Sequence, residues 1–313
     1  MTAPDTTMSY DLVMSHSSGL ALDHACAIAL RSEAGHPFRI DEGDSWAMCS
    51  SPGRTRVLAG LGGWITGCWY SPSKRAYFVD TRGGVTVYSG LDGDPVQSTT
   101  DQLDAALFGV WGLSDELVLA WGERAGQSRM FRFDGARWAP FPAPVGMVIA
   151  LHGKRADQLV AVGARGLLAR WDGQRWNAVP QPTGLVLNAV WVESDDEMYA
   201  TGPSGIVMEG SVHGWAIRLT APGDLYGVAK WKGELWFGCG RAGLGKLGGG
   251  KVGGETVELV KLDDPKLPVT QLDARRDLVM TAGTHVGASA DGVAFQHGFE
   301  DVMLDIAGRP RLW

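Results

Sequence analysis

The chain has 313 residues, a formal net charge of −7 at pH 7 and 44 glycines. Its acidic balance argues against a nucleic-acid-binding protein, because such a protein needs a basic face. Glycine is about twice as frequent as the roughly 7% of an average protein. The glycines are spread along the whole chain, so they indicate many tight turns instead of one flexible linker.

The cysteines and the N-terminal region carry no sign of metal binding or export. Each cysteine stands in an apolar context without metal-ligand spacing, so we predict buried thiols. The four are Cys26, Cys49, Cys68 and Cys239. The first apolar run, residues 20–30, is interrupted by Asp23 and His24, and no basic segment precedes it. It resembles neither a signal peptide nor a membrane span, and we therefore expect a cytoplasmic protein.

From the N-terminus onward, we predict a disordered tail at residues 1–8 and one β-propeller over residues 9–313. Residues 10–15 alternate loosely and predict a lone strand. A unit of strands and Gly turns then recurs seven times. The units cover about residues 19–60, 64–100, 107–142, 147–180, 186–219, 225–260 and 269–300.

The third and fourth units show the repeat most clearly. Each contains a small-residue strand, a charged turn, two further apolar strands and a closing aromatic-Asp-Gly-x-x-Trp, read as RFDGARW and RWDGQRW. A period of about 40 residues with four short strands is typical of a propeller blade. Residues 38–46, FRIDEGDSW, echo FRFDGARW (131–138), so we expect the third strand of the first unit and its turn there.

Two columns of small residues recur at fixed positions. One, on the innermost strand, suits a site where neighbouring blades crowd together; it contains Gly67, Gly109, Ala150, Ala189 and Gly227. The other follows each second strand, where we expect glycines with positive φ to open a hairpin; it contains Gly122, Gly163, Gly202, Gly240 and Gly283.

Tryptophans also recur in register, which favours packing between blades over an aromatic sugar-binding platform. One column contains Trp69, Trp111 and Trp191, and another contains Trp46, Trp138, Trp176 and Trp215. With RFDGARW and RWDGQRW, the repeat resembles the bacterial Trp-rich propeller repeats that include the photosystem assembly-factor-like and Asp-box-like propellers. That resemblance implies a binding scaffold, although a fold alone does not specify a function.

The sequence thus predicts an all-β protein, a single closed propeller of seven four-stranded blades. We expect a terminal strand, at residues 10–15 or 302–306, to complete a blade that the other end of the chain mainly supplies, because such closure removes an open sheet edge.

No motif predicts a cofactor. GCGRAG (238–243) fits a dinucleotide loop, but LGKLGGGKVGG follows it and cannot form the helix that such a loop needs. SADGVAF (289–295) is an Asp box without its Thr-Trp ending, which is a turn motif. No nucleophile elbow G-x-S-x-G is present. We therefore predict no catalytic residues, no bound metal and no enzymatic activity.

A metal-dependent, lactonase-like hydrolase remains an alternative. Such a propeller would hold a divalent ion with oxygen ligands from its inner strands. The residues that could serve are Asn188, Asp273, Asp305 and Asp23.

The leading prediction is a protein-binding scaffold, monomeric apart from its partner and without nucleic-acid or membrane contacts. Its candidate contacts are variable inner-strand positions and charged loop residues. They are Thr66, Phe108, Asn188, Tyr226, Thr270, Glu193, Asp195, Asp196, Arg124 and Lys74. The acidic chain would attract a basic partner, so an immunity or antitoxin-like protein that neutralises a toxin or effector is the most specific form of the prediction. A small-ligand or sugar site in the central funnel, with Tyr226, Phe108 and Asn188, is the other alternative.

Overall fold

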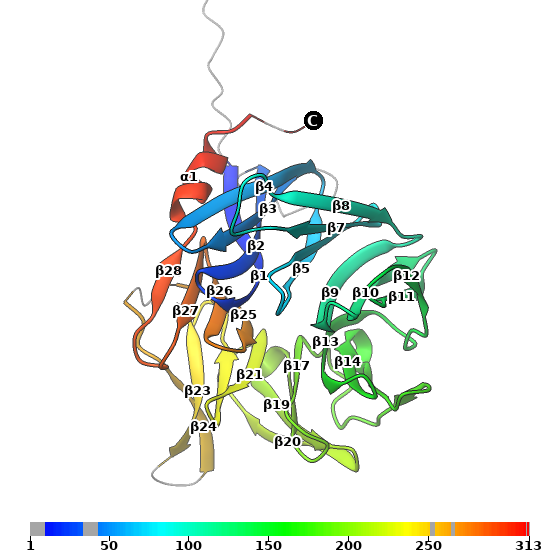
Figure 1. Cartoon of the computed structure of the whole chain (residues 1–313). Helices are drawn as coiled ribbons and strands as arrows, with labels where there is room; N and C mark the ends of the chain where they lie inside the picture. Colours follow the sequence, from blue (N-terminus) through cyan, green and yellow to red (C-terminus); the bar gives the residue numbers. More distant parts are fainter. Residues whose placement is uncertain (1–9, 34–42, 251–253, 264–266, 311, 313) are drawn as a thin grey trace, which may run out of the picture.

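The computed structural model describes residues 10–33, 43–250, 254–263, 267–310 and 312. Seven four-stranded antiparallel sheets surround one central axis, so the prediction of a seven-bladed, all-β propeller is confirmed. Figure 1 shows the ring, with the first strand of each blade turned toward its centre. The predicted tail at residues 1–8 lies outside the described residues.

The first three blades come from the N-terminal part of the chain. Blade 1 contains β1 (Tyr10–Ala21), β2 (His24–Glu33), β3 (Asp44–Ser51) and β4 (Arg54–Gly62). Blade 2 contains β5 (Ile65–Tyr70), β6 (Ala76–Asp80), β7 (Gly84–Ser89) and β8 (Gln97–Gln102). Blade 3 contains β9 (Ala106–Ser114), β10 (Leu117–Arg124), β11 (Gln127–Phe133) and β12 (Trp138–Phe141).

Four further blades complete the ring. Blade 4 contains β13 (Val148–Arg155), β14 (Gln158–Gly163), β15 (Leu168–Trp171) and β16 (Trp176–Ala178). Blade 5 contains β17 (Ala189–Val192), β18 (Met198–Thr201), β19 (Ile206–Ser211) and β20 (Gly214–Thr220). Blade 6 contains β21 (Gly227–Trp231), β22 (Glu234–Gly238), β23 (Leu244–Gly250) and β24 (Gly254–Leu259). Blade 7 contains β25 (Val269–Ala274), β26 (Leu278–Ala282), β27 (His285–Ser289) and β28 (Gln296–Gly298), and the helix α1 (Glu300–Ala307) follows it.

Close approach of neighbouring chain segments explains most of the recurring glycines. A Cβ atom on Gly67 would lie 2.8 Å from the Cα atom of Gly109 in the next blade. A Cβ atom on Gly122 would overlap the carbonyl oxygen of Ala106. In the column after the second strands, only Gly240 (φ 55°) and Gly283 (φ 62°) have positive φ. The expectation of positive φ is therefore wrong at Gly122, Gly163 and Gly202, where glycine is needed because the backbones lie so close.

The Asp-Gly motifs form the turn between the third and fourth strands. Asp134 Oδ1 accepts the backbone N–H groups of Ala136 (3.0 Å) and Arg137 (2.9 Å). Asp172 makes the equivalent bonds to Gln174 and Arg175, and these backbone hydrogen bonds lower the pKa of Asp172 to about 2. Trp138 and Trp176 then begin the fourth strands of their blades.

Trp46 does not belong to that column. It lies in β3, the third strand of blade 1, and is completely buried. The expected equivalence of residues 38–46 with residues 131–138 is wrong at its tryptophan, because Trp138 begins a fourth strand and Trp46 lies inside a third strand. Residues 38–42 lie outside the described residues.

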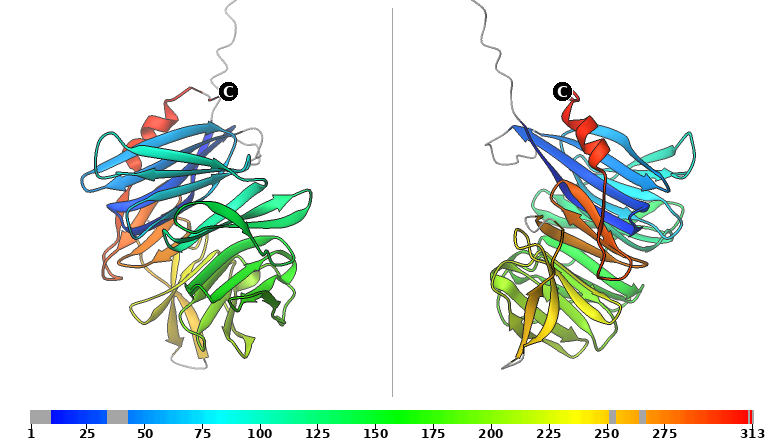
Figure 2. Two further views of the ribbon diagram at one scale, coloured as in Figure 1. Left: turned by 45° about the vertical axis from the view of Figure 1, so that its right-hand side comes forward. Right: turned by 90° about the vertical axis from the view of Figure 1, so that its left-hand side faces the viewer.

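The ring closes without an exchanged strand, so that expectation is wrong. Residues 10–15 are part of β1, which pairs only with β2 inside blade 1, and blade 7 is complete at β28. Residues 302–306 are helical instead of extended. Helix α1 lies against the outer side of blades 1 and 7 (Figure 2), where it covers the junction between the first and last blades.

The spacing of its apolar residues explains why α1 is a helix. Phe299, Val302, Met303 and Ile306 follow one another at intervals of three or one residues and form a single helical face. All four are buried with Met14 and Trp46 of blade 1. Leu304, on the opposite side, is 74% exposed.

Candidate functional site

The two faces of the propeller are defined by the direction of the innermost strands. Equivalent residues of neighbouring blades meet: the Thr66 hydroxyl donates to the Leu107 carbonyl oxygen (2.8 Å), and the Asn188 amide donates to that of Leu225 (2.8 Å). All seven innermost strands therefore run parallel along the channel. We call the face where they begin the start face and the face where they finish the end face. The start face carries the linkers between blades and the turns between second and third strands.

A cavity of about 700 Å³ occupies the central channel, and all seven innermost strands line it. Blades 3 to 6 supply mainly apolar side chains, including Phe108, Ile149 and Tyr226. Blades 1 and 7 supply a polar wall, including His16, Gln271 and Arg275. The channel is therefore polar on one side and apolar on the other.

The charged groups of the polar wall neutralise one another. Arg275 donates to both carboxylate oxygens of Asp273 (2.6 and 3.0 Å) and to Ser18 Oγ (3.0 Å). Ser18 Oγ in turn donates to Asp273 Oδ2 at 2.7 Å. Burial lowers the pKa of His16 to about 4, so its imidazole is neutral at physiological pH. The wall offers polar groups without an unpaired charge.

Aromatic side chains continue from blade to blade near the end face. His152 stacks on Trp191 with ring centroids 4.2 Å apart and lies 5.6 Å from the ring of Trp111. His152 Nδ1 accepts the backbone N–H of Val192 (2.9 Å), which links blade 4 to blade 5. Burial first, and the nearby charge of Lys154 second, lower the pKa of His152 to about 3. These contacts agree with the expected role of this column in packing between blades.

Exposed apolar residues gather on the start face. Five large apolar side chains that are exposed lie there in blades 4 to 6, in the linkers before the innermost strands and at the start of β13. They are Val145, Met147, Ile149, Leu185 and Tyr226. We call these five the apolar rim. Its members come from the start of β13 and from the linkers before β13, β17 and β21.

One turn joins most of the apolar rim. The turn at residues 164–166 of blade 4 lies between two linkers: the Ala164 N–H donates to the Met147 carbonyl oxygen (3.0 Å), and a Cβ atom on Gly166 would lie 3.0 Å from Gly184 Cα. Val145 and Met147 on one side, and Leu185 on the other, therefore flank the same turn. Val145 is 97% exposed, although removing a large apolar side chain from water is favourable.

The end face carries many charged side chains, and several of them form ion pairs with one another. In the acidic loop at residues 193–197, Glu193 pairs with Lys154 (3.3 Å) and Glu197 with Lys230 (2.5 Å). Asp195 accepts from Arg155 and from Gln158. The loop therefore contributes bridges between blades, in addition to a solvated negative surface.

The residues predicted from the sequence divide between the two faces. Thr66, Phe108, Asn188, Tyr226 and Thr270 lie at the beginnings of the innermost strands, toward the start face, and Arg124 also lies on that face. Lys74, Glu193, Asp195 and Asp196 lie on the end face. The two groups therefore do not form one continuous surface. The side-chain hydrogen bonds of Thr66 and Asn188 connect neighbouring blades.

The residues considered as metal ligands are not brought together. Asp273 pairs with Arg275, Asp23 with Arg276 (2.9 Å), and Asp305 of α1 with Arg309 (2.6 Å), which follows the helix. Among the described residues, no group of three or more His, Cys, Asp or Glu side chains is placed to hold a metal ion. The amide of Asn188 is directed to the Leu225 carbonyl oxygen.

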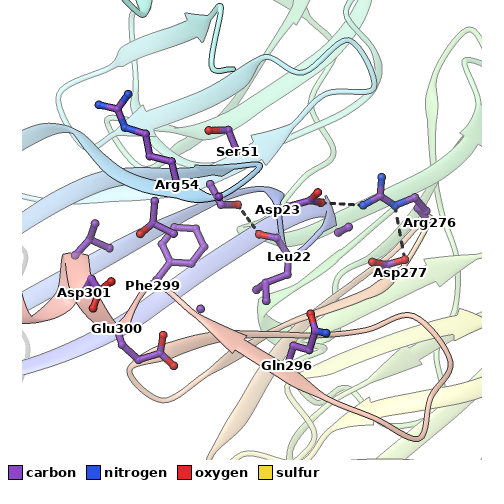
Figure 3. Close-up of a pocket in the computed structure, with 16 residues that line it drawn as sticks. Leu22, Asp23, Ser51, Arg54, Arg276, Asp277, Gln296, Phe299, Glu300 and Asp301 are labelled. Atoms are coloured by element: carbon purple, nitrogen blue, oxygen red, sulfur yellow. Dashed lines mark hydrogen bonds and ion pairs between the residues drawn. The ribbon is translucent and has the colours of Figure 1, made fainter. Parts of the chain in front are cut away.

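A second hollow of about 780 Å³ lies at the junction of blades 1 and 7 on the end face. Figure 3 shows Asp23 and Arg276 paired on one side of it and Phe299, Glu300 and Asp301 on the other. Arg276 also approaches Asp277 (3.7 Å). This hollow is the groove that α1 leaves beside the blade junction.

Three members of the apolar rim were not predicted from the sequence as candidate contacts. Val145, Met147 and Leu185 stand in linkers, where composition alone does not tell an exposed apolar residue from a buried one. The available signal was the apolar content of APVGM (143–147) between two predicted blades, where polar turn residues would be ordinary.

No protein-family model matches the chain, and no curated protein sequence matches it. The structure is similar to solved β-propellers. The WD40 β-propeller domain of Doa1 is 11% identical, with a TM-score of 0.63 over 95% of this chain and 99% of that one. YCF48, solved bound to a D1 peptide, is 10% identical, with a TM-score of 0.62 over 91% and 98%. Sqt1 of Saccharomyces cerevisiae is 11% identical, with a TM-score of 0.58 over 93% and 86%.

At these identities the comparisons show a shared fold, and the resemblance to propeller repeat proteins holds at that level. Within the described residues, no helix has the length and apolar character needed to cross a membrane.

Proposed function

We propose that this propeller is a non-enzymatic, cytoplasmic scaffold that binds a protein partner through its start face. The apolar rim carries the proposal. Contiguous exposed apolar residues on a soluble protein mark interaction sites, because water contact with them is unfavourable. The rim belongs to linkers held by backbone hydrogen bonds, so it presents a pre-organised surface. YCF48, which shares the fold, has been solved with a bound peptide, and this supports the assignment.

A narrower form of the proposal is neutralisation of a basic toxin or effector. It is supported by the net charge of −7, which would speed capture of a basic partner. Asp196, for which no ion pair is found within the described residues, is the acid of the 193–197 loop with most freedom to contact such a partner. That partner would occupy the end face.

Site-specific photo-crosslinking tests which face binds. A photoreactive amino acid is placed at Met147 on the start face or at Val293, an 82% exposed residue in a loop of the end face. We expect a covalent adduct in host cells from position 147 and none from position 293. The partner, identified by mass spectrometry and purified, should bind Met147→Asp at least tenfold more weakly than Val293→Asp, a loss of about 1.4 kcal/mol. Adducts from position 293 alone would contradict docking on the start face and favour the toxin form.

Small-molecule binding in the channel is a second candidate, and the two-sided lining of its cavity favours it. A volume of about 700 Å³ lies within the roughly 300–1,000 Å³ typical of ligand sites. A sugar or other neutral ligand could place an apolar face on Phe108 and hydrogen-bond to Gln271. Such a ligand would protect channel residues, and not Val145 or Leu185, from chemical or photochemical labelling.

A further inference from the structure

Arginine recurs at the tips of the turns between second and third strands. The turns read TRGG in blade 2, RAGQ in blade 3, ARGL in blade 4 and GRAGL in blade 6. Each of these arginines is exposed, and each lies within two residues of a glycine with positive φ. They are Arg82, Arg124, Arg165 and Arg241. Blade 5 has Ser204 and blade 7 has Thr284 at the corresponding place.

Two of the four guanidinium groups have no partner in the part of the chain that the structure describes. Arg82 donates to the Gly62 carbonyl oxygen, and Arg124 pairs with Asp104. No hydrogen bond or ion pair to a described residue engages the side chains of Arg165 or Arg241. An arginine that makes no internal contact remains able to bind a carboxylate through two parallel hydrogen bonds.

Both unpaired arginines adjoin exposed apolar side chains. Arg165 stands in the turn that Met147 and Leu185 flank. Arg241 follows Gly240, where an added Cβ would lie 2.7 Å from Tyr226 Cε2. Blade 5, between them, presents Ser204, whose backbone N–H donates to Asp224 (2.8 Å). Across blades 4 to 6, the start face therefore presents Arg165, the apolar entrance of the channel and Arg241, in that order.

We propose that the start face recognises an acidic peptide segment in which carboxylates flank an apolar side chain. The apolar side chain would rest on Ile149 and Tyr226 at the channel mouth, and the carboxylates would bind Arg165 and Arg241. The proposal rests on docking at the start face and adds the chemistry of the partner. The net charge of −7 would favour a basic partner, whereas this proposal predicts an acidic one. The difference arises because the charged groups near a binding face determine which partner it attracts.

Selection from a random 12-residue peptide library on the purified protein tests the chemistry without a known ligand. We expect enriched peptides to contain Asp or Glu on both sides of Phe, Leu, Ile or Trp. The best peptide, labelled with a fluorophore, should bind Arg165→Glu and Arg241→Glu about tenfold more weakly than wild type, and Arg54→Glu on the end face equally well. Raising NaCl from 50 to 500 mM should weaken binding to wild type, because salt screens exposed charges.

The variants separate this inference from the proposed function. Enriched peptides that are basic or uncharged, or binding unaffected by both arginine reversals, would overturn the acidic-peptide inference. If Met147→Asp still abolished binding in that case, docking on the start face would stand. If no peptide were enriched, the acidic-peptide inference would fall, and the crosslinks from position 147 would decide docking on the start face. If a peptide were enriched and neither Met147→Asp nor the arginine reversals changed its binding, both would fall.

Discussion

Arg31 and Asp44 form a buried ion pair, with Arg31 Nη2 2.6 Å from Asp44 Oδ2 and side chains 3% and 1% exposed. The same guanidinium donates to the carbonyl oxygens of Ile306 (3.3 Å), Arg309 (2.7 Å) and Pro310 (3.0 Å). Blade 1 therefore binds the C-terminal end of α1 and the residues that follow it through one arginine. Carbonyl groups at the end of a helix lack intrahelical partners, and a cation there is favourable.

Replacement of Arg31 should strongly destabilise the protein. Arg31→Met leaves the Asp44 carboxylate buried without its cation and removes a donor from three carbonyl groups. Loss of one partner from a buried pair costs about 3–5 kcal/mol. Urea denaturation should show this loss in the free energy of unfolding.

The matched control lies in the same blade. Arg54 pairs with Asp94 at 2.7 Å, but their side chains are 52% and 66% exposed. Arg54→Met should change the free energy of unfolding by less than about 1 kcal/mol. Equal effects of the two substitutions would show that the Arg31 pair is not a buried clamp.

Helix α1 provides a second pair of substitutions that share an element. Ile306 is completely buried against blades 1 and 7, and Leu304 is 74% exposed. Ile306→Ala should cost about 2–5 kcal/mol because it opens a cavity at the ring junction. Leu304→Ala should stay within about 0.5 kcal/mol of wild type in the same denaturation experiment. If both behave alike, α1 does not hold the ring closed.

The sequence repeat made the propeller architecture predictable. The two ends of the chain, which do not repeat, were the least predictable part. Small residues at Gly67 and Gly109 recur because neighbouring innermost strands touch there, so in-register alignment finds the blades. No second copy exists for α1. Its Val302–Ile306 segment is too short for periodicity to separate a helix from a strand, and its helical face depends on burial against Trp46.

The candidate site was predictable only in part. Variable positions at the beginnings of the innermost strands identified Phe108 and Tyr226, which do line the channel. The exposure of Val145 and Leu185 depends on where linkers lie over the blade 4 turn, and the internal pairing of Glu193 and Glu197 depends on the neighbouring blades. Both features depend on tertiary contacts, which the sequence alone does not reveal.

Gly122 offers a test of the close-approach explanation. A methyl group there would overlap the Ala106 carbonyl oxygen, which is backbone and cannot move aside freely. Gly122→Ala should therefore cost about 1–3 kcal/mol or more in thermal or urea denaturation. Gly214→Ala, in an outer strand with open space around the added methyl, should change stability little. A neutral Gly122→Ala would show that the nearby Ala106 carbonyl oxygen does not require glycine at this position.

The two partly buried histidines that line the channel should make stability depend on pH above the range in which carboxylates titrate. Burial lowers the pKa of His16 to about 4 and that of His152 to about 3, while an unfolded histidine has a pKa of about 6.5. Below pH 6.5 the unfolded chain binds protons that the folded chain does not, so stability falls as pH decreases. Each histidine should remove about 2 kcal/mol between pH 7 and pH 5.

Urea denaturation at several pH values between 7 and 5 measures this slope. His152→Gln should remove about half of it whatever its effect on stability at pH 7, because glutamine does not titrate. Loss of packing alone would lower stability equally at every pH and leave the slope unchanged. A wild-type stability that is constant from pH 7 to pH 5 would show that these imidazoles are protonated in the folded protein, contrary to the lowered pKa that their desolvation beside the channel predicts.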